Sequence, residues 1–230
     1  MPDRPRPPAE LAERTARLKD GRVIALRHGR PGDEAGIARL VVAGFPLYRR
    51  AARGDPERAA HAFAQELGVG EFVVAALPEH GGLIGATCIT GRGEGGVGRL
   101  PRLRRKLARW GPYGLACFGF EKLRSHLCNG SHRVRPGELY RYLTAVDAPF
   151  RSQGVATQLA DFVDDYARAA GLRTVLALHD ADNVVVLALH RKRGCTLVEL
   201  PRTRFSDWLR HPTVVMSRRE LAARPGPPAL

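Results

Sequence analysis

The sequence contains few of the residues that build metal centres or disulfide frameworks. It has four cysteines in 230 residues, with no C-x-x-C pair and no histidine at zinc-finger spacing. We therefore expect no metal site, and we expect free thiols in a reducing compartment, which indicates a cytoplasmic protein. The cysteines are Cys88, Cys117, Cys128 and Cys195.

Long apolar runs are also missing. The N-terminal segment MPDRPRPPAELAERTARLKDG lacks the apolar stretch of a secretory signal. No later segment approaches the roughly 20 apolar residues that a membrane-spanning helix needs. The sequence therefore predicts a soluble protein.

Acidic residues are scarce relative to basic ones. The chain has 37 Lys and Arg against 23 Asp and Glu, which gives a net charge of +14. Such an excess favours acidic partners, and a phosphorylated cofactor, nucleic acid and anionic lipid all meet this description. Asp161, Asp164 and Asp165 form an acidic group within one predicted helix, and we expect them on its solvated face.

What is present is an alternation of strand-like and helix-like segments, which predicts an α/β domain with a mixed sheet. Strands are predicted at 22–29, 71–77, 82–91, 137–148, 173–179, 195–200 and 213–219, and helices at 37–44, 55–67, 157–171 and 183–194. Residues 1–21 are interpreted as an N-terminal extension, either a mobile segment or an added helix. Residues 22–221 then form a single domain, and 222–230 a disordered tail.

Residues 92–136 interrupt this order as a basic insert. Leu100, Leu103, Leu107 and Trp110 recur at helical spacing, and the remaining positions are mainly basic: Arg102, Arg104, Arg105, Lys106 and Arg109. A second short helix is predicted around Phe120–Leu127. Two interpretations remain open, a lid that closes over a substrate and a basic solvated helix packed on one edge of the domain.

One short motif carries a chemical prediction. RSQGVA, Arg151–Ala156, lies between a predicted strand and a predicted helix. Gly154 permits a close backbone approach, and the unpaired N–H groups of the helix N-terminus attract an anion. Arg151 and Gln153 add donors beside it, and Thr157 adds a hydroxyl. A phosphate group is the expected ligand.

The same motif resembles the Q/R-x-x-G-x-G/A loop that holds the acetyl-CoA pyrophosphate in the GNAT superfamily of N-acetyltransferases. The preceding TAVDAPF is similar to the V-x-P-x-x-R approach of that family, although its proline is displaced from position 148 to Pro149. Downstream, Asn183, Leu189, Lys192 and Gly194 match the family pattern N-x-x-A-x-x-L-Y-x-K-x-G-F. Val186, His190 and Cys195 depart from it, standing for Ala, Tyr and Phe.

The resemblance implies a mixed, mostly antiparallel central sheet flanked by helices, with a helical insert between the third and fourth strands. It also implies acetyl-CoA as co-substrate along a splayed fourth strand, with attack on its thioester by a primary amine. The implied cofactor-binding residues are Ala145, Val146, Arg151, Ser152, Gln153, Gly154, Val155, Ala156, Thr157 and Asn183.

Three residues are candidates for proton transfer. His190 takes the place of the family tyrosine and is either the acid for the leaving thiolate or a structural histidine. Strand alternation places Glu138, Tyr140 and Tyr142 on one side and Leu139, Arg141 and Leu143 on the other. Glu138 directly, or a water held by Tyr140, is then the expected base. The expected substrate-binding residues are Phe45, Tyr48, Tyr142 and His179.

The partner that the resemblance implies is a small-molecule or peptide amine. A second class of function remains open, in which the fold is a scaffold and the basic insert binds RNA, the ribosome or an anionic membrane. An N-acyltransferase with a longer acyl chain is a third alternative, and a homodimer is neither required nor excluded.

Overall fold

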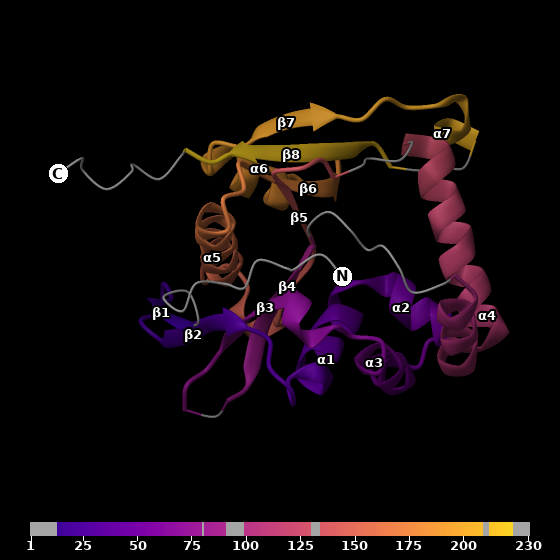
Figure 1. Ribbon diagram of the computed structural model, residues 1–230, viewed down its shortest axis with the longest axis horizontal. Coiled ribbons are helices and arrows are strands. Elements are labelled where there is room, and N and C mark those ends of the chain that lie inside the picture. The colour runs from indigo at the N-terminus through magenta and orange to yellow at the C-terminus, as the bar shows by residue number, and fades with distance from the viewer. Residues whose placement is uncertain (1–12, 80, 91–98, 130–133, 209–211, 223–230) are drawn as a thin grey trace.

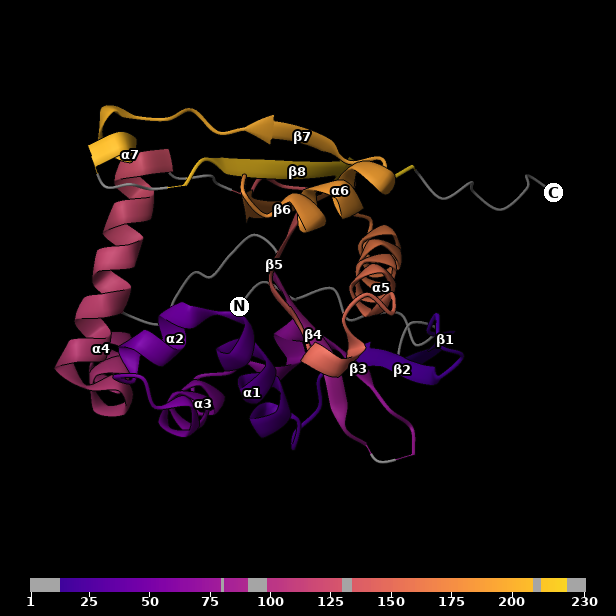
Figure 2. The same ribbon diagram turned by 180° about the vertical axis from the view of Figure 1, so that it is seen from behind.

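The computed structural model describes residues 13–79, 81–90, 99–129, 134–208 and 212–222. Its centre is an eight-stranded sheet in the order β1-β2-β3-β4-β5-β6-β8-β7 (Figures 1 and 2). Neighbouring strands are antiparallel except β5 and β6, which are parallel. The strands are β1 (Glu13–Arg17), β2 (Val23–His28), β3 (Phe72–Ala76), β4 (Leu83–Thr90), β5 (Glu138–Val146), β6 (Thr174–Asp180), β7 (Thr196–Glu199) and β8 (Val214–Glu220). The predicted mixed, mostly antiparallel sheet is confirmed.

The first strand corrects the sequence-based division. ERTAR pairs with β2 from Glu13↔Arg27 to Arg17↔Val23 and so belongs to the sheet. The segment has no apolar alternation, because as an edge strand it is only half-buried along its length. The prediction of a helix or a mobile segment is therefore wrong for these residues, and the sheet begins before Arg22. The remainder of the predicted N-terminal extension, residues 1–12, lies outside the described residues.

Three helices follow β2 and cover one face of the sheet: α1 (Glu34–Gly44), α2 (Pro46–Ala51) and α3 (Pro56–Ala64). α3 begins as predicted, because the Asp55 side chain accepts hydrogen bonds from the backbone of Glu57 and Arg58. α2 was not predicted, since its sequence PLYRRA is short and mostly polar.

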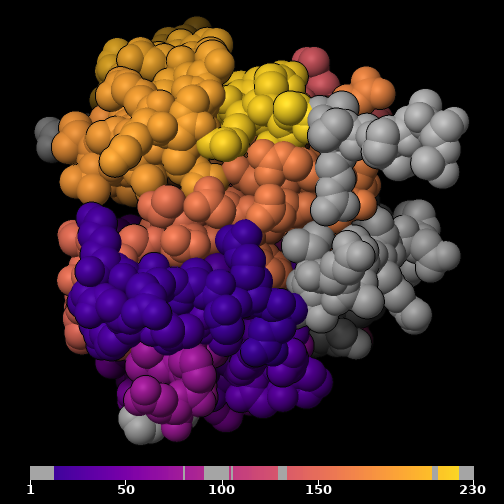
Figure 3. All heavy atoms as spheres, turned by 90° about the vertical axis from the view of Figure 1, so that its left-hand side faces the viewer, coloured from indigo at the N-terminus to yellow at the C-terminus, as the bar shows by residue number. Residues whose placement is uncertain are grey.

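Two apolar cores lie on opposite faces of the sheet. α1 and α3 bury Ile37, Val41 and Phe63 against Val74 and Cys88 on one face. The other face packs against α5 (Val155–Ala169). There, the central apolar residues of that helix are Leu159, Phe162 and Val163, which contact strand residues such as Leu26 and Val73. Figure 3 shows α5 between the N-terminal strands and the C-terminal strands.

The predicted insert contains one long element, α4 (Arg99–Asn129), interrupted at Gly111 (φ 67°, ψ 178°) before Pro112. Trp110 is buried at 3% exposure, whereas Leu107 is 43% exposed, so the predicted apolar stripe does not share one environment. α4 packs along α2 and reaches α7 (Arg204–Trp208), at the side of the domain (Figure 1). The Thr203 hydroxyl donates to the carbonyl of Leu127 and ties the two regions together.

The C-terminal part alternates as predicted, with α6 (Val184–Lys192) between β6 and β7. The N-cap of α6 is Asn183, whose side chain accepts from Val186 N. Among the described helices, none is both long and apolar enough to cross a membrane.

Candidate active site

The pairing between β5 and β6 stops early and leaves an opening in the sheet. Only Glu138↔Thr174, Leu139↔Val175 and Tyr140↔Leu176 are paired. The described β5–β6 ladder ends at Tyr140, and beyond it the two strands separate (Figure 2). An unpaired strand edge presents backbone donors and acceptors to an extended ligand.

A bulge in β5 lies beside this opening. Ala86 pairs with Ala145 and Cys88 pairs with Tyr142, so β5 has one residue more than β4 between these pairs. Leu143 absorbs the irregularity with φ 50°, an unusual conformation for a leucine. The bulge reverses the alternation, because Tyr142, Leu143 and Ala145 all join the core on the α1 side. The prediction that Leu143 faces away from Tyr142 is therefore wrong.

The loop 147–154 carries the chain from β5 to α5. Gly154 is the N-cap of α5 with φ 97°, and no side chain caps the helix. The earliest amide after Gly154 with a described backbone acceptor is that of Gln158, which donates to Gly154 O at 3.0 Å. The N–H groups of the first turn, Val155 to Thr157, therefore lack a described protein acceptor. A Cβ placed on Gly154 would meet no atom within 4 Å, so the backbone there is open to an approaching group.

The start of α5 is held firmly against the sheet. A Cβ on Gly85 in β4 would lie 2.7 Å from the Val155 side chain, so only glycine allows this close contact. Phe150 is buried, and the Arg22 guanidinium lies 4.3 Å from its ring centroid. Ser152 adopts φ 63°, a left-handed conformation that costs a serine free energy. These contacts hold the helix N-terminus in place without using its donors.

The Arg151 side chain folds back over β5. Its Nε donates to the carbonyl of Val146 at 3.3 Å, and the residue is exposed. The Arg151 guanidinium, which was predicted to flank a bound phosphate, therefore lies beside the loop 147–154. Gln153 is half-buried, and its carbonyl accepts from the Lys19 backbone, which links the loop to the β1–β2 turn.

Tyr140 and Tyr142 lie on the face of β5 opposite α5. Their rings are stacked with centroids 5.5 Å apart and an interplanar angle of 7°. Burial raises the pKa of Tyr140, so its phenol stays protonated near neutral pH. Tyr140 belongs to the last β5–β6 pair, and its hydroxyl is a hydrogen-bonding group rather than a base.

Glu138 lies deeper, in the paired part of β5. Its residue exposure is 6%, and Oε2 accepts from Arg135 N at 2.8 Å. Arg218 approaches Oε1 at 3.8 Å. One carboxylate oxygen of the predicted base is therefore already occupied by a backbone bond.

The predicted acid, His190, is buried on the α5 side of the sheet. Its Nε2 lies 2.9 Å from Arg141 Nη2. A guanidinium only donates, so Nε2 accepts and the imidazole proton is on Nδ1. Burial, followed by the charge of Arg141, lowers the pKa of His190 to about 3. His190 is therefore neutral near pH 7, which leaves no imidazolium to serve as the predicted acid.

His179 packs beside His190, with ring centroids 4.4 Å apart. Its Nε2 is 3.1 Å from the Ser217 hydroxyl, and burial lowers its pKa to about 4. Two other predicted substrate contacts lie on the α1 side. Tyr48 packs between Phe63 and Trp110, with the Phe63 ring centroid 4.8 Å away, and burial raises its pKa to about 12. Phe45 packs against the same core.

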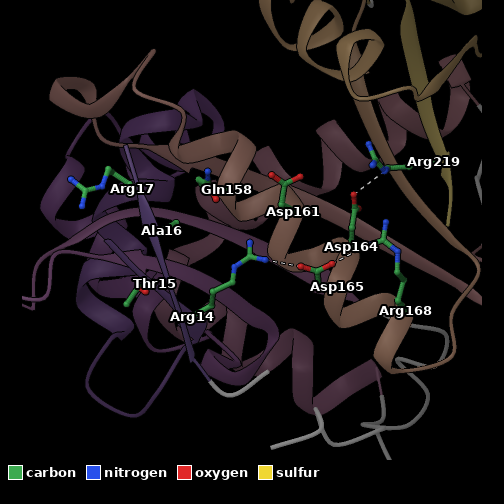
Figure 4. A pocket seen from close by; sticks show the side chains of 10 residues that line it. All are labelled: Arg14, Thr15, Ala16, Arg17, Gln158, Asp161, Asp164, Asp165, Arg168 and Arg219. Carbon is green, nitrogen blue, oxygen red and sulfur yellow. Dashed lines mark hydrogen bonds and ion pairs between the residues drawn. The ribbon is translucent and has the colours of Figure 1, made fainter. Parts of the chain in front are cut away.

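A cavity of about 470 Å³ lies between β1 and α5, away from the opening between β5 and β6 (Figure 4). Charged pairs line it, including Arg14 with Asp165 at 2.6 Å and Arg168 with Asp165 at 2.8 Å. Three of its four arginines, Arg14, Arg168 and Arg219, are already paired with aspartates, so the cavity offers less for a phosphate than the α5 N-terminus does.

The model of the acetyltransferase (GNAT) family matches residues 114–195, which contain the split strand pair, the loop and α5. This part of the chain resembles the GNAT family. A comparison of the sequence with curated proteins finds no match. The GNAT domain of PAT from S. lividans has a similar structure, with a TM-score of 0.55, 17% identity, and coverage of 93% of this chain and 99% of that chain.

Two further GNAT structures have the same fold. An acetyltransferase from Listeria monocytogenes has a TM-score of 0.53 and 12% identity, covering 90% of this chain and 100% of that chain. A putative acetyltransferase from Desulfovibrio desulfuricans has a TM-score of 0.52 and 16% identity, covering 86% of this chain and 99% of that chain. The resemblance stated from the sequence is thereby confirmed at the level of family and fold.

The GNAT fold brings the predicted cofactor residues of β5, the loop and α5 to one side of the opening. Asn183 has a different role from these residues, because its side-chain Oδ1 accepts from Val186 N and caps α6. The sequence analysis placed Arg141 correctly on the side of β5 opposite Tyr140 and Tyr142, but it assigned no function to this residue. The available signal was a single arginine inside the otherwise uncharged strand segment YRYLTAV.

Proposed function

We propose that the protein is an N-acetyltransferase that takes an acetyl group from acetyl-CoA and transfers it to a primary amine in a ternary complex. The amine belongs to a small molecule or a peptide. The observation that carries this proposal is the uncapped N-terminus of α5 beside the unpaired edge of β5.

The donors present fit the proposed co-substrate. The first-turn amides of α5 and the Gly154 backbone suit a diphosphate, which binds to converging N–H groups and to the positive helix end. The free edge of β5 at Ala145 and Val146 suits an amide-containing arm, which would complete the ladder. When bound, acetyl-CoA supplies an activated thioester for transfer to nitrogen.

The amine is proposed to approach from the face that carries Tyr140 and Tyr142. An amine arrives as an ammonium ion and must lose a proton before it attacks. Tyr140, protonated and partly buried, would hold a water that receives this proton. Glu138 remains the alternative acceptor, although its bond from Arg135 restrains one oxygen.

The test is binding and turnover with defined ligands. Acetyl-CoA is expected to raise the melting temperature of the full chain, whereas adenosine alone is not, because adenosine lacks the diphosphate. A panel of primary amines is then screened for release of free thiol. Absence of any acetyl-CoA-dependent stabilisation, together with salt-sensitive retention on RNA or anionic vesicles, would replace the enzyme by the scaffold alternative.

A further inference from the structure

Arg141 is a buried cation without a carboxylate of its own. The residue is 6% exposed, and its described hydrogen bond is the one from Nη2 to His190 Nε2. Its buried Nε has no partner among the described residues. Asp164 contributes charge nearby, but its Oδ2 is taken up by Arg193 at 2.6 Å and Arg219 at 2.8 Å. Buried arginines are normally paired, so this one needs a further explanation.

The surroundings of Arg141 carry an excess of positive charge. Arg141, Arg193 and Arg219 face the carboxylates of Asp161 and Asp164, while the two neighbouring histidines are neutral. Burial lowers the pKa of Arg141 to about 10, which still leaves the guanidinium charged near pH 7. One positive charge is therefore not balanced within this cluster.

The position of Arg141 relates this charge to the opening in the sheet. Arg141 directly follows Tyr140, the last β5 residue paired with β6. Its side chain points to the α5 and α6 side, where it lines a small cavity together with Ala177, His190 and Ser217. The Nδ1 of His190 is also buried without a partner. Two unpartnered N–H groups, Arg141 Nε and His190 Nδ1, thus lie where the strands begin to separate.

We propose, on the basis of the function proposed above, that Arg141 stabilises the thiolate of coenzyme A as it leaves, and that His190 positions the guanidinium. The amine nitrogen bonds to the acetyl carbon, the C–S bond breaks, and its electron pair stays on sulfur. The surplus amine proton passes to water. The negative charge on sulfur is then offset by a fixed cation, and no proton donor is required.

The alternative ligand for Arg141 is a carboxylate of the acceptor. The faces of the sheet favour the thiolate, because Arg141 shares its side with α5, whose N-terminus is the proposed diphosphate site. The proposed acceptor face, with Tyr140 and Tyr142, lies on the other side of β5.

The experiment measures the pKa of the coenzyme A thiol when it is bound to the full chain. Ultraviolet absorbance of the thiolate is followed against pH for the wild type, Arg141→Gln, Arg141→Lys and the control Lys192→Gln, which removes an exposed charge from α6. We expect the bound thiol to ionise about one pH unit or more below the pKa of free coenzyme A, measured in the same buffer, in the wild type, Lys192→Gln and, more weakly, Arg141→Lys. Arg141→Gln is expected to abolish the shift and to lower kcat about 10–100-fold with bound acetyl-CoA.

A wild-type measurement keeps the proposal testable should Arg141→Gln fail to fold. Coenzyme A, whose thiol ionises, should gain about tenfold in affinity relative to acetyl-CoA as pH rises through the bound thiol pKa. Equal pH dependence of the two affinities, or an unshifted thiol pKa in the wild type, overturns the role of Arg141. Failure of both ligands to bind overturns the proposed function instead.

Discussion

The hydroxyls of Thr87 in β4 and Thr144 in β5 lie 2.7 Å apart, and this hydrogen bond spans the bulge. Thr87 is fully buried. The bond therefore satisfies a polar group in the core at the point where β5 departs from regular pairing. It also fixes the strand beside Leu143, which has a left-handed conformation.

Thr144→Val is expected to lower the free energy of unfolding by about 1–2 kcal/mol, because it leaves the buried Thr87 hydroxyl with only a weak contact to the Tyr142 carbonyl at 3.5 Å. Urea denaturation measures the change. Thr196→Val, at an exposed position of β7, is the matched control and should change stability by less than about 0.5 kcal/mol. Equal effects of the two substitutions would contradict the importance of this bond.

Gly154→Glu is expected to abolish the stabilisation of the chain by acetyl-CoA, because the added carboxylate would occupy and repel the diphosphate at the α5 N-terminus. Gly171→Glu is the control at the other end of α5. Gly171 also has a positive φ, of 71°, and open space around its Cβ position. Differential scanning fluorimetry with and without acetyl-CoA should show a ligand-dependent shift in Gly171→Glu and none in Gly154→Glu. A retained shift in Gly154→Glu would place the diphosphate elsewhere.

Stability is expected to fall as the pH drops below about 6.5. Folding lowers the pKa of His190 from 6.5 to about 3, chiefly by burial and then by the charge of Arg141, so the unfolded chain binds a proton that the folded chain does not. The stabilisation is complete above the unfolded pKa and is lost on acidification, by about 2 kcal/mol for His190 between about pH 7 and pH 5. His179 changes in the same direction.

The variant His190→Gln tests this assignment. Its amide oxygen can still accept from Arg141, but the side chain does not titrate. Chemical denaturation at a series of pH values should therefore give a shallower slope for the variant than for the wild type. Parallel slopes would show that other groups produce the acid sensitivity.

Tyr140→Phe is expected to lower kcat about 100-fold without changing the stabilisation by acetyl-CoA, because it removes the hydroxyl proposed to hold the proton-accepting water. Glu138→Gln should have a smaller effect, since a glutamine oxygen can still accept from Arg135 N. Steady-state rates over a pH series distinguish the two. Loss of the low-pH ionisation from the rate profile in Glu138→Gln alone would identify Glu138 as the direct base.

The sequence was sufficient for the elements that bury a periodic apolar face. Ile37, Leu40 and Val41 predicted α1 correctly, and RSQGVA located the uncapped helix start. β1 and α2 escaped prediction because their sequences are largely polar, and the strand is fixed by its pairing with β2. The bulge at Leu143 has no local signal, so regular alternation was extended one residue too far.

Buried polar groups were the least predictable part of the site. Asp164 was expected on a solvated face, yet it is 3% exposed and paired with Arg193 and Arg219, which come from α6's C-terminal end and β8. That expectation is wrong because helical spacing shows which residues share a face but not which distant charges meet them. The contact between Arg141 and His190 likewise joins residues 49 positions apart.

The early end of the β5–β6 pairing has a mechanical consequence. Among the described residues, three β5–β6 pairs connect strands β1 to β5 with β6, β8 and β7. All three pairs lie at the same end of the β5–β6 boundary. The sheet thus has two parts that are joined at one end only. A ligand that formed hydrogen bonds with both β5 and β6 beyond the last pair would restrain the two parts relative to each other. Ligand binding at the open edge of β5 would then reduce the motion of α6 and β7, far from the contact, as much as that of the loop 147–154.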